Sequence, residues 1–208
     1  MSADLTRRPD LTTIGRWMKR GSRILDLGCG DGTLLEYLRE RRSAEGYGIE
    51  IDDSNIVRCI TKGLSVIQSD LDGGLSDFDA GSFDYVVLSQ TLQAVRYPDR
   101  LLLEMMRVGR EGIVTFPNMG YWKHRLHLTI HGRMPVSTAT AAPGEWYNTP
   151  NIHLCTLRDF ESLCADLDIE ILEMTAVNSD HRSNPLIRKW PNVLGEIALY
   201  RFRQRDAG

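Results

Sequence analysis

The residues best suited to chemistry are a glycine-rich loop and an acid that follows it in the sequence. The loop at 28–32 reads Gly-Cys-Gly-Asp-Gly and follows an apolar strand predicted at 23–27. Glycines let the main chain approach a ligand where any Cβ would clash. Glu50 ends a second predicted strand about 20 residues further on, where a carboxylate can accept both hydroxyls of a ribose. The pattern therefore predicts a nucleoside site.

The glycine spacing and Asp26 indicate which nucleoside is bound. A nicotinamide dinucleotide favours G-x-G-x-x-G, whereas this loop reads G-x-G-x-G. Asp26 lies two residues before the loop, where it would repel a pyrophosphate but can receive the ammonium group of an amino acid. We therefore expect S-adenosylmethionine or S-adenosylhomocysteine, and the pattern disfavours a dinucleotide-dependent oxidoreductase.

In open parallel sheets, ligands bind outside the carboxyl ends of the strands, and this rule predicts further candidate residues. Asp70 is a candidate for the adenine amino group, although a helix cap or a turn acid is the alternative. Ile51 or Leu71 can cover the adenine face, and Ser89 and Gln90 lie nearest the methionine end. The predicted cofactor-binding residues are Asp26, Gly28, Cys29, Gly30, Gly32, Glu50, Ile51, Asp70, Leu71, Ser89 and Gln90.

The elements that must position these residues alternate along the chain. Apolar runs predict strands at 23–27, 47–51, 64–68, 83–88 and 112–116, with amphipathic helices between them. We expect the helix after Asp52 to turn Ile56, Val57 and Ile60 inward. This alternation is typical of an α/β fold with a doubly wound, mostly parallel sheet.

The alternation stops at an aromatic, histidine-rich segment at about 117–155. It resumes at Thr156, where a capping box begins a further helix. Two last strands are predicted at 169–176 and 195–202, and the polar residues 178–192 between them are expected to form an exposed loop.

Composition bounds the remaining possibilities. The 208 residues suit one α/β domain, and a net charge of −3 with a pI near 6.0 does not indicate a nucleic-acid or membrane partner. The four cysteines form no C-x-x-C pair and are expected to be reduced thiols. With no signal peptide or spanning segment expected either, the sequence predicts a cytoplasmic protein.

Several stretches resemble a known family. The loop at 28–32 resembles motif I of the class I methyltransferases. Residues 23–31, 82–93, 116–118 and, above all, 146–156 resemble the MetW proteins of bacterial methionine biosynthesis, and the resemblance covers nearly the whole chain.

The resemblance to the MetW proteins implies a single Rossmann-like domain over 1–208, with an aromatic and basic insertion at about 117–155 and an antiparallel last strand. It also implies association with the homoserine O-acyltransferase (MetX-like) of the same pathway, whose activity in some bacteria depends on such a protein.

Catalytic residues are harder to predict, because methyl transfer depends mainly on in-line approach and a general base is optional. If a base exists, His153, Glu145 and Tyr147 are the candidates, but their segment is better explained as packing over the sheet and docking a partner. Cys29 has no base beside it in the loop, so we do not expect a nucleophile.

Three histidines at helical spacing, His124, His127 and His131, raise the possibility of a metal site. Lys123 and Arg125 lie among them and disfavour a cation, so we expect a basic amphipathic helix and no metal. The main hypothesis is a methyl-donor-binding protein that supports the acyltransferase. The alternative is an active methyltransferase on a small-molecule acceptor.

Overall fold

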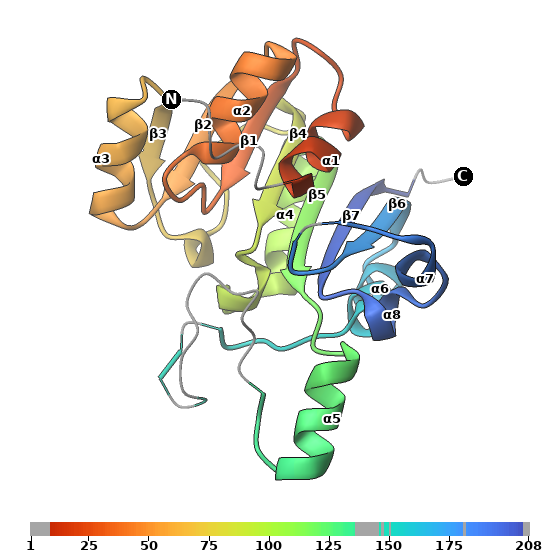
Figure 1. The fold of residues 1–208 in the computed structure, drawn as a ribbon. Helices are drawn as coiled ribbons and strands as arrows, with labels where there is room; N and C mark the ends of the chain where they lie inside the picture. The colour runs from red at the N-terminus through yellow and green to blue at the C-terminus, as the bar shows by residue number, and fades with distance from the viewer. Residues whose placement is uncertain (1–8, 136–145, 147, 150, 181, 206–208) are drawn as a thin grey trace.

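The described residues form a sheet of seven strands, which makes the middle layer of the protein (Figure 1). The computed structural model describes residues 9–135, 146, 148–149, 151–180 and 182–205. The strands are β1 (Arg23–Leu27), β2 (Glu45–Glu50), β3 (Ser65–Gln68), β4 (Phe83–Ser89), β5 (Gly109–Pro117), β6 (Ile169–Val177) and β7 (Ile197–Gln204). Their spatial order is β3-β2-β1-β4-β5-β7-β6.

The direction of the strands confirms the expected sheet. Neighbours from β3 to β5 are parallel, and β7 runs antiparallel to both β5 and β6. The last strand is therefore the antiparallel one, as predicted. Because β1 to β5 all run the same way, their carboxyl ends lie along one edge of the sheet, which is where the candidate residues were expected.

The central strands are buried on both faces, as continuous apolar runs in a parallel sheet should be. Leu25 and Leu27 of β1 pack into one core cluster with Leu88 of β4. Ile24 of β1 and Val87 of β4 point to the other face and join a second cluster. The two clusters are the apolar layers that bind helices to each side of the sheet.

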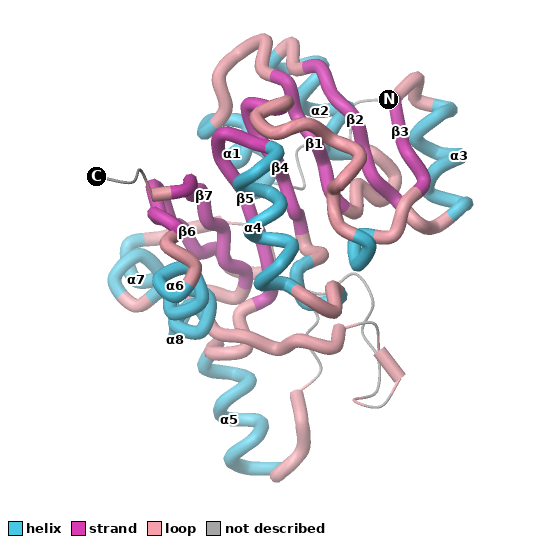
Figure 2. Tube along the Cα trace, turned by 180° about the vertical axis from the view of Figure 1, so that it is seen from behind, coloured by secondary structure: helices cyan, strands magenta, loops and turns pink. Residues whose placement is uncertain are grey.

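Helices cover both faces of the sheet (Figure 2). α1 (Pro9–Trp17) and α2 (Thr33–Arg42) pack into one cluster, and α4 (Pro98–Val108) and α6 (Leu157–Asp166) into the other. The predicted capping box is present at the start of α6, where Thr156 and Asp159 exchange hydrogen bonds. These helices fix the sheet edge that carries the candidate site.

The helix after Asp52, α3 (Asp53–Thr61), corrects one prediction. Asp52 does cap the helix, but Val57 and Ile60 are each 62% exposed. The buried side chain is Cys59, because α3 lies at the edge of the sheet beside β3 and faces the glycine loop (Figure 1). The prediction assumed that the larger apolar side chains are buried, whereas the structure buries the smaller Cys59 thiol.

Residues 178–192 were expected to form an exposed loop, and this was wrong in part. Two short helices lie in or beside this segment, α7 (Pro185–Lys189) and α8 (Pro191–Leu194). A proline begins each helix, where its missing N–H costs nothing, and the Asn184 side chain caps α7 by accepting from the Ile187 amide. Ile187 is buried, so the segment packs against the domain.

The helix predicted among the histidines is α5 (Trp122–His131), which follows the carboxyl end of β5 and extends away from the sheet (Figure 1). Among its residues only His124 is buried, and the remaining side chains are exposed or half-buried. Two 3-10 turns, η2 (Leu71–Gly73) and η3 (Leu92–Ala94), follow β3 and β4. Among the described residues, no helix is long and apolar enough to cross a membrane.

Candidate functional site

A cavity of about 290 Å³ lies at the carboxyl ends of the parallel strands. Six of the predicted residues line it: Gly28, Glu50, Ile51, Asp70, Leu71 and Gln90. Thr91, Gln93, Val95 and Asn151 also line it, although the sequence prediction did not include them. The volume is near the lower end of the range for small-molecule sites.

The glycine loop borders the cavity through Gly28. Gly30 has a φ of 55°, and a side chain added there would meet no atom within 4 Å. A side chain at Gly28 would instead meet Thr91 Cγ2 at 2.7 Å, and one at Gly32 would collide with Leu64. Gly30 therefore leaves room for a ligand, whereas Gly28 and Gly32 permit close packing of the protein itself.

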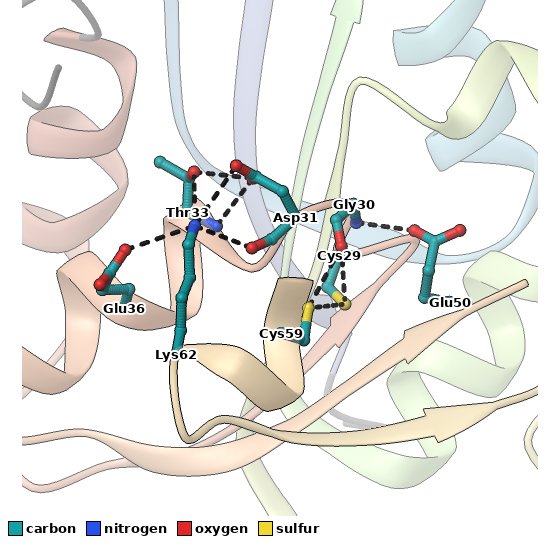
Figure 3. Close-up of polar contacts among 8 residues, drawn as sticks. All are labelled: Cys29, Gly30, Asp31, Thr33, Glu36, Glu50, Cys59 and Lys62. Atoms are coloured by element: carbon teal, nitrogen blue, oxygen red, sulfur yellow. Dashed lines mark hydrogen bonds and ion pairs between the residues drawn. The ribbon is translucent and has the colours of Figure 1, made fainter. Parts of the chain in front are cut away.

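Glu50 connects the second strand to the glycine loop (Figure 3). Its Oε2 accepts a hydrogen bond from the Gly30 amide over 2.7 Å. Its Oε1 accepts from the amides of Ile51 and Asp52, each over 2.9 Å. The residue is only 8% exposed, so these three donors hold the carboxylate in one position at the cavity wall.

Residues at the end of α3 hold the other side of the loop. Lys62 Nζ donates to the Asp31 main-chain oxygen over 2.8 Å and lies 3.3 Å from the Asp31 carboxylate. The Cys59 thiol donates to the Gly30 oxygen over 3.2 Å. Figure 3 shows these contacts on the side of the loop away from Glu50. With its carbonyl groups bound toward α3, the loop presents the Gly30 amide to Glu50.

The charges around this contact favour an ionised Asp31. Burial raises the pKa of the Asp31 carboxyl group, but hydrogen bonds from Thr33 and the Lys62 ammonium outweigh this effect. The pKa of Asp31 is therefore held below its usual range. Lys62 also lies 3.4 Å from the Glu36 carboxylate, so one ammonium group joins α3 to both the loop and α2.

Cys29 lies in the loop, but its thiol does not line the cavity. Its Sγ is 3.9 Å from Cys59 Sγ. Burial and the nearby negative charge of Asp26 raise the pKa of the Cys29 thiol far above its usual value, and burial raises that of Cys59. Burial of this kind favours the protonated thiol, and the expectation that Cys29 is no nucleophile stays a prediction.

Two glutamine side chains give the cavity a polar wall. Gln90 has a φ of 57°, which is uncommon for a residue other than glycine, and both side-chain amide atoms are buried without a hydrogen-bond partner in the described structure. Gln93 is 5% exposed and donates from Nε2 to the Gln90 main-chain oxygen over 2.7 Å. Its Oε1 also finds no partner among the described residues. Because an unpaired buried polar group costs about 1–3 kcal/mol, these atoms favour a polar ligand.

The other predicted residues divide into two groups. Asp70 lines the cavity and also caps η2, its Oδ1 accepting from the Asp72 amide over 2.9 Å, so the predicted cap is present and the contact with adenine stays a prediction. Asp26 and Ser89 do not line the cavity. Asp26 is buried within β1, and the Ser89 hydroxyl is 3.2 Å from that of Thr115. Their proposed roles at the amino-acid end stay predictions.

The segment 151–156 borders the cavity on a further side. Asn151 lines the cavity, and the amides of Ile152 and His153 donate to the Gln93 main-chain oxygen over 2.8 and 2.9 Å. The Met119 amide donates to the Cys155 oxygen over 3.0 Å, which ties the segment to the chain before α5. The sequence motif at 146–156 was noted, but its contact with the cavity depends on tertiary structure.

Of the three candidate bases, the structure describes only His153. His153 is exposed, and its Nε2 lies 3.2 Å from the Arg96 main-chain oxygen. Glu145 and Tyr147 lie outside the described residues. Their catalytic roles stay predictions.

The three histidines of α5 are arranged differently from one another. His127 and His131 stack with ring centroids 4.6 Å apart, while His124 is buried against Tyr121. Among the described residues, no group of three or more histidine, cysteine or acidic side chains is placed to hold a metal.

The strand order, with β7 antiparallel between β5 and β6, and the cavity at the carboxyl ends define a class I methyltransferase fold. The chain belongs to the family described as methionine biosynthesis protein MetW, whose profile matches residues 8–202. A curated relative from Rhodopirellula baltica, the bifunctional methionine biosynthesis protein MetXA/MetW, is 36% identical over 98% of this chain. The match spans 34% of that relative, so the chain is about a third as long.

Solved structures support the fold alone. A chain from the complex between the Haloferax volcanii Trm112 methyltransferase activator and the putative methyltransferase has a TM-score of 0.69 and 14% identity, over 98% of this chain and 92% of that one. A SAM-dependent methyltransferase from Aquifex aeolicus has a TM-score of 0.62 and 13% identity, over 97% and 93%. Identity at this level does not transfer an activity.

Proposed function

We propose that the cavity at the carboxyl ends of β1, β2 and β4 binds S-adenosylmethionine or S-adenosylhomocysteine. The observation that carries this proposal is the position of Glu50, which lines the cavity and contacts the glycine loop. A carboxylate has about four acceptor sites, and three main-chain amides use only part of them. Glu50 can therefore also accept a ribose hydroxyl without losing its position.

The remaining residues of the cavity fit the two ends of such a ligand. Ile51 and Leu71 offer apolar surface for the adenine face, and Asp70 offers a carboxylate oxygen to its amino group. Gln90 offers a buried donor and acceptor to the amino-acid end. Asp26 lies outside the cavity lining, and its proposed role is to supply the negative charge for the ammonium group. When bound, S-adenosylmethionine would supply an activated methyl group.

The second part of the proposal is that the chain acts with a homoserine O-acyltransferase and supports its activity in methionine biosynthesis. Support comes from the Rhodopirellula relative, in which the region similar to this chain is one part of a bifunctional MetXA/MetW protein. Units joined in one polypeptide are held at high effective concentration, so their separate homologues are good candidates for association.

The surface proposed to bind the acyltransferase, called the docking surface here, comprises α5 and the segment 151–156. Its exposed apolar residues are Trp122, Leu126, Leu128, Ile130, Ile152 and Leu154. Single exposed apolar residues are common, but several of them on two connected segments are typical of an interaction site. Trp146, which is 76% exposed, precedes the segment and is a candidate anchor because tryptophan often dominates interface energetics.

The alternative is an active methyltransferase with a small-molecule acceptor, a class of enzyme whose fold this chain shares. The two functions differ in what becomes of the methyl group. Support of the acyltransferase needs no consumption of the methyl donor, whereas methyl transfer converts each donor to S-adenosylhomocysteine.

One pair of measurements tests the proposal. Calorimetry with S-adenosylmethionine, S-adenosylhomocysteine and NADH should show binding of the first two and none of the third. A homoserine O-acylation assay with both purified proteins should then show faster acylation in the presence of this chain, with the methyl donor intact. Unchanged acylation together with stoichiometric methylation of a metabolite would establish the alternative.

A further inference from the structure

The cavity and the docking surface share one segment of the chain. Asn151 lines the cavity, and the next residue, Ile152, is 55% exposed on the docking surface. Leu154, two residues further, is 48% exposed. A ligand in the cavity and a protein on the docking surface would therefore contact neighbouring residues of the same extended segment.

The segment is held in place by the residue that also forms the polar wall of the cavity. The main-chain oxygen of Gln93 accepts from both Ile152 and His153, over 2.8 and 2.9 Å. The side chain of the same residue donates to the Gln90 oxygen over 2.7 Å and lines the cavity. Gln93 thus contributes to the cavity and, through its main-chain oxygen, binds the segment 151–156 of the docking surface.

This wall is costly unless a polar ligand pairs with it. Both amide atoms of Gln90 and the Oε1 of Gln93 are buried without a partner among the described residues, and Gln90 has a positive φ. A ligand that pairs with these atoms stabilises this arrangement of η3 more than any arrangement in which the amides turn toward water. It thereby stabilises the main-chain acceptor that holds Ile152 and His153.

We infer that occupation of the cavity by S-adenosylmethionine or S-adenosylhomocysteine strengthens binding of the acyltransferase at the docking surface. The inference rests on the proposed function, since it requires both the ligand and the partner. It adds the direction of coupling, which is positive because the ligand stabilises the conformation that presents the segment 151–156. Coupling between two binding sites is reciprocal, so the partner must strengthen ligand binding by the same factor.

The experiment measures both sides of this cycle with the full chain. The dissociation constant for a purified homoserine O-acyltransferase is determined without ligand and with saturating S-adenosylhomocysteine, which cannot donate a methyl group. The dissociation constant for S-adenosylhomocysteine is determined with and without saturating acyltransferase. Both should fall by the same factor of about five or more, within the range usual for coupled sites.

Two variants test whether the coupling between the cavity and the docking surface depends on Gln93. Gln93→Leu removes the amide from the cavity wall and keeps the main-chain oxygen, so the coupling factor should approach one. Val57→Ser changes a residue of α3 that is 62% exposed and distant from α5, and it should preserve the factor (Figure 1). Preserved coupling in Gln93→Leu would overturn the proposed route.

The outcomes distinguish this inference from the proposed function. If both partners bind and the factor is one, or if the ligand weakens the complex, the inference is overturned and the proposed function stands. If the acyltransferase does not bind with or without ligand, the inference and the proposed association are both overturned, and the dissociation constant for S-adenosylhomocysteine alone still decides the cofactor part of the proposal. A matching factor measured from both sides supports both.

Discussion

Lys62 Nζ lies 2.8 Å from the main-chain oxygen of Asp31, so a side chain at the end of α3 binds a carbonyl group of the glycine loop. The Asp31 and Glu36 carboxylates, 3.3 and 3.4 Å away, fix the position of the ammonium group. Neither Lys62 nor Asp31 lines the cavity, so the contact would act by holding the loop that binds Glu50, which does line it. Lys62 is therefore a positioning residue for the proposed cofactor site.

Lys62→Met should weaken binding of S-adenosylhomocysteine by about 5- to 30-fold, because loss of a charge-assisted hydrogen bond of roughly 1–2 kcal/mol lets the loop move. Lys62→Arg should recover part of the affinity. Lys19→Met, at an exposed position outside the loop, is the matched control. Calorimetry gives the affinities, and equal binding by Lys62→Met and the wild type would show that the contact does not position the loop.

Gly30→Val should abolish ligand binding and leave the protein folded, because the new side chain enters open space next to Glu50, which lines the cavity. A positive φ also makes valine unfavourable by roughly 1–2 kcal/mol, so the control must carry the same strain. Gly21→Val meets this need, since Gly21 has a φ of 71° and no neighbouring atom within 4 Å. Both variants should lose similar stability in thermal unfolding, and only Gly30→Val should lose ligand affinity.

Glu50→Ala should lower ligand affinity by about 1–3 kcal/mol, because it leaves the ribose hydroxyls unpaired. Since Glu50 also binds the Gly30 amide, affinity alone does not separate a ribose contact from a change in the loop. The 2′-deoxy analogue of S-adenosylhomocysteine separates them. The wild type should bind the analogue more weakly than the parent ligand, and Glu50→Ala should bind both alike. Continued discrimination by the variant would place the ribose elsewhere.

The residues of these three predictions were not equally accessible from the sequence. Gly30 and Glu50 follow from local spacing, because the order of strand, glycine loop and acid is itself the signal. Lys62 gave no such signal, since its partner Asp31 is 31 residues away and the contact depends on how α3 packs.

Gln93 and Asn151 illustrate the same limit at the cavity. Gln93 follows the strand predicted at 83–88, and Asn151 lies in the segment at 117–155, so they are far apart in the sequence. Only the folded chain shows that η3 and the segment 151–156 meet beside Gln90. The prediction of the buried face of α3 was wrong for a different reason. Its apolar residues suggested one inward face, and its position at the sheet edge buries Cys59 instead.

His124 should make stability depend on pH. Burial lowers the pKa of its imidazole, an effect that Glu196 opposes and His127 and Lys123 reinforce. The unfolded chain, with a histidine pKa of about 6.5, then binds more protons than the folded chain, so stability is present above that value and is lost as pH falls through it. Urea unfolding from pH 8 to pH 5 should show this loss, and His124→Gln should reduce it.

The exposed His131 provides the matched control for that measurement, because it lies on the same helix. His131→Gln should retain the wild-type dependence of unfolding free energy on pH. An unchanged slope in His124→Gln would assign the pH dependence to other groups.

Trp146→Ala should weaken the complex with the acyltransferase and lower its activity, while S-adenosylmethionine affinity stays nearly unchanged. A tryptophan that is 76% exposed in the free chain and buried by a partner can contribute 2 kcal/mol or more, by the usual energetics of such anchors, which is roughly a 30-fold loss of affinity. Ile130→Ser, at a residue of α5 that is 65% exposed, should weaken the complex as well. Ile60→Ser removes an equally exposed isoleucine from α3 and should have no effect, because α3 lies far from α5 (Figure 1). Pull-down and acylation assays with both purified proteins measure these effects, and equal losses in all three variants would mean that the partner does not recognise the docking surface.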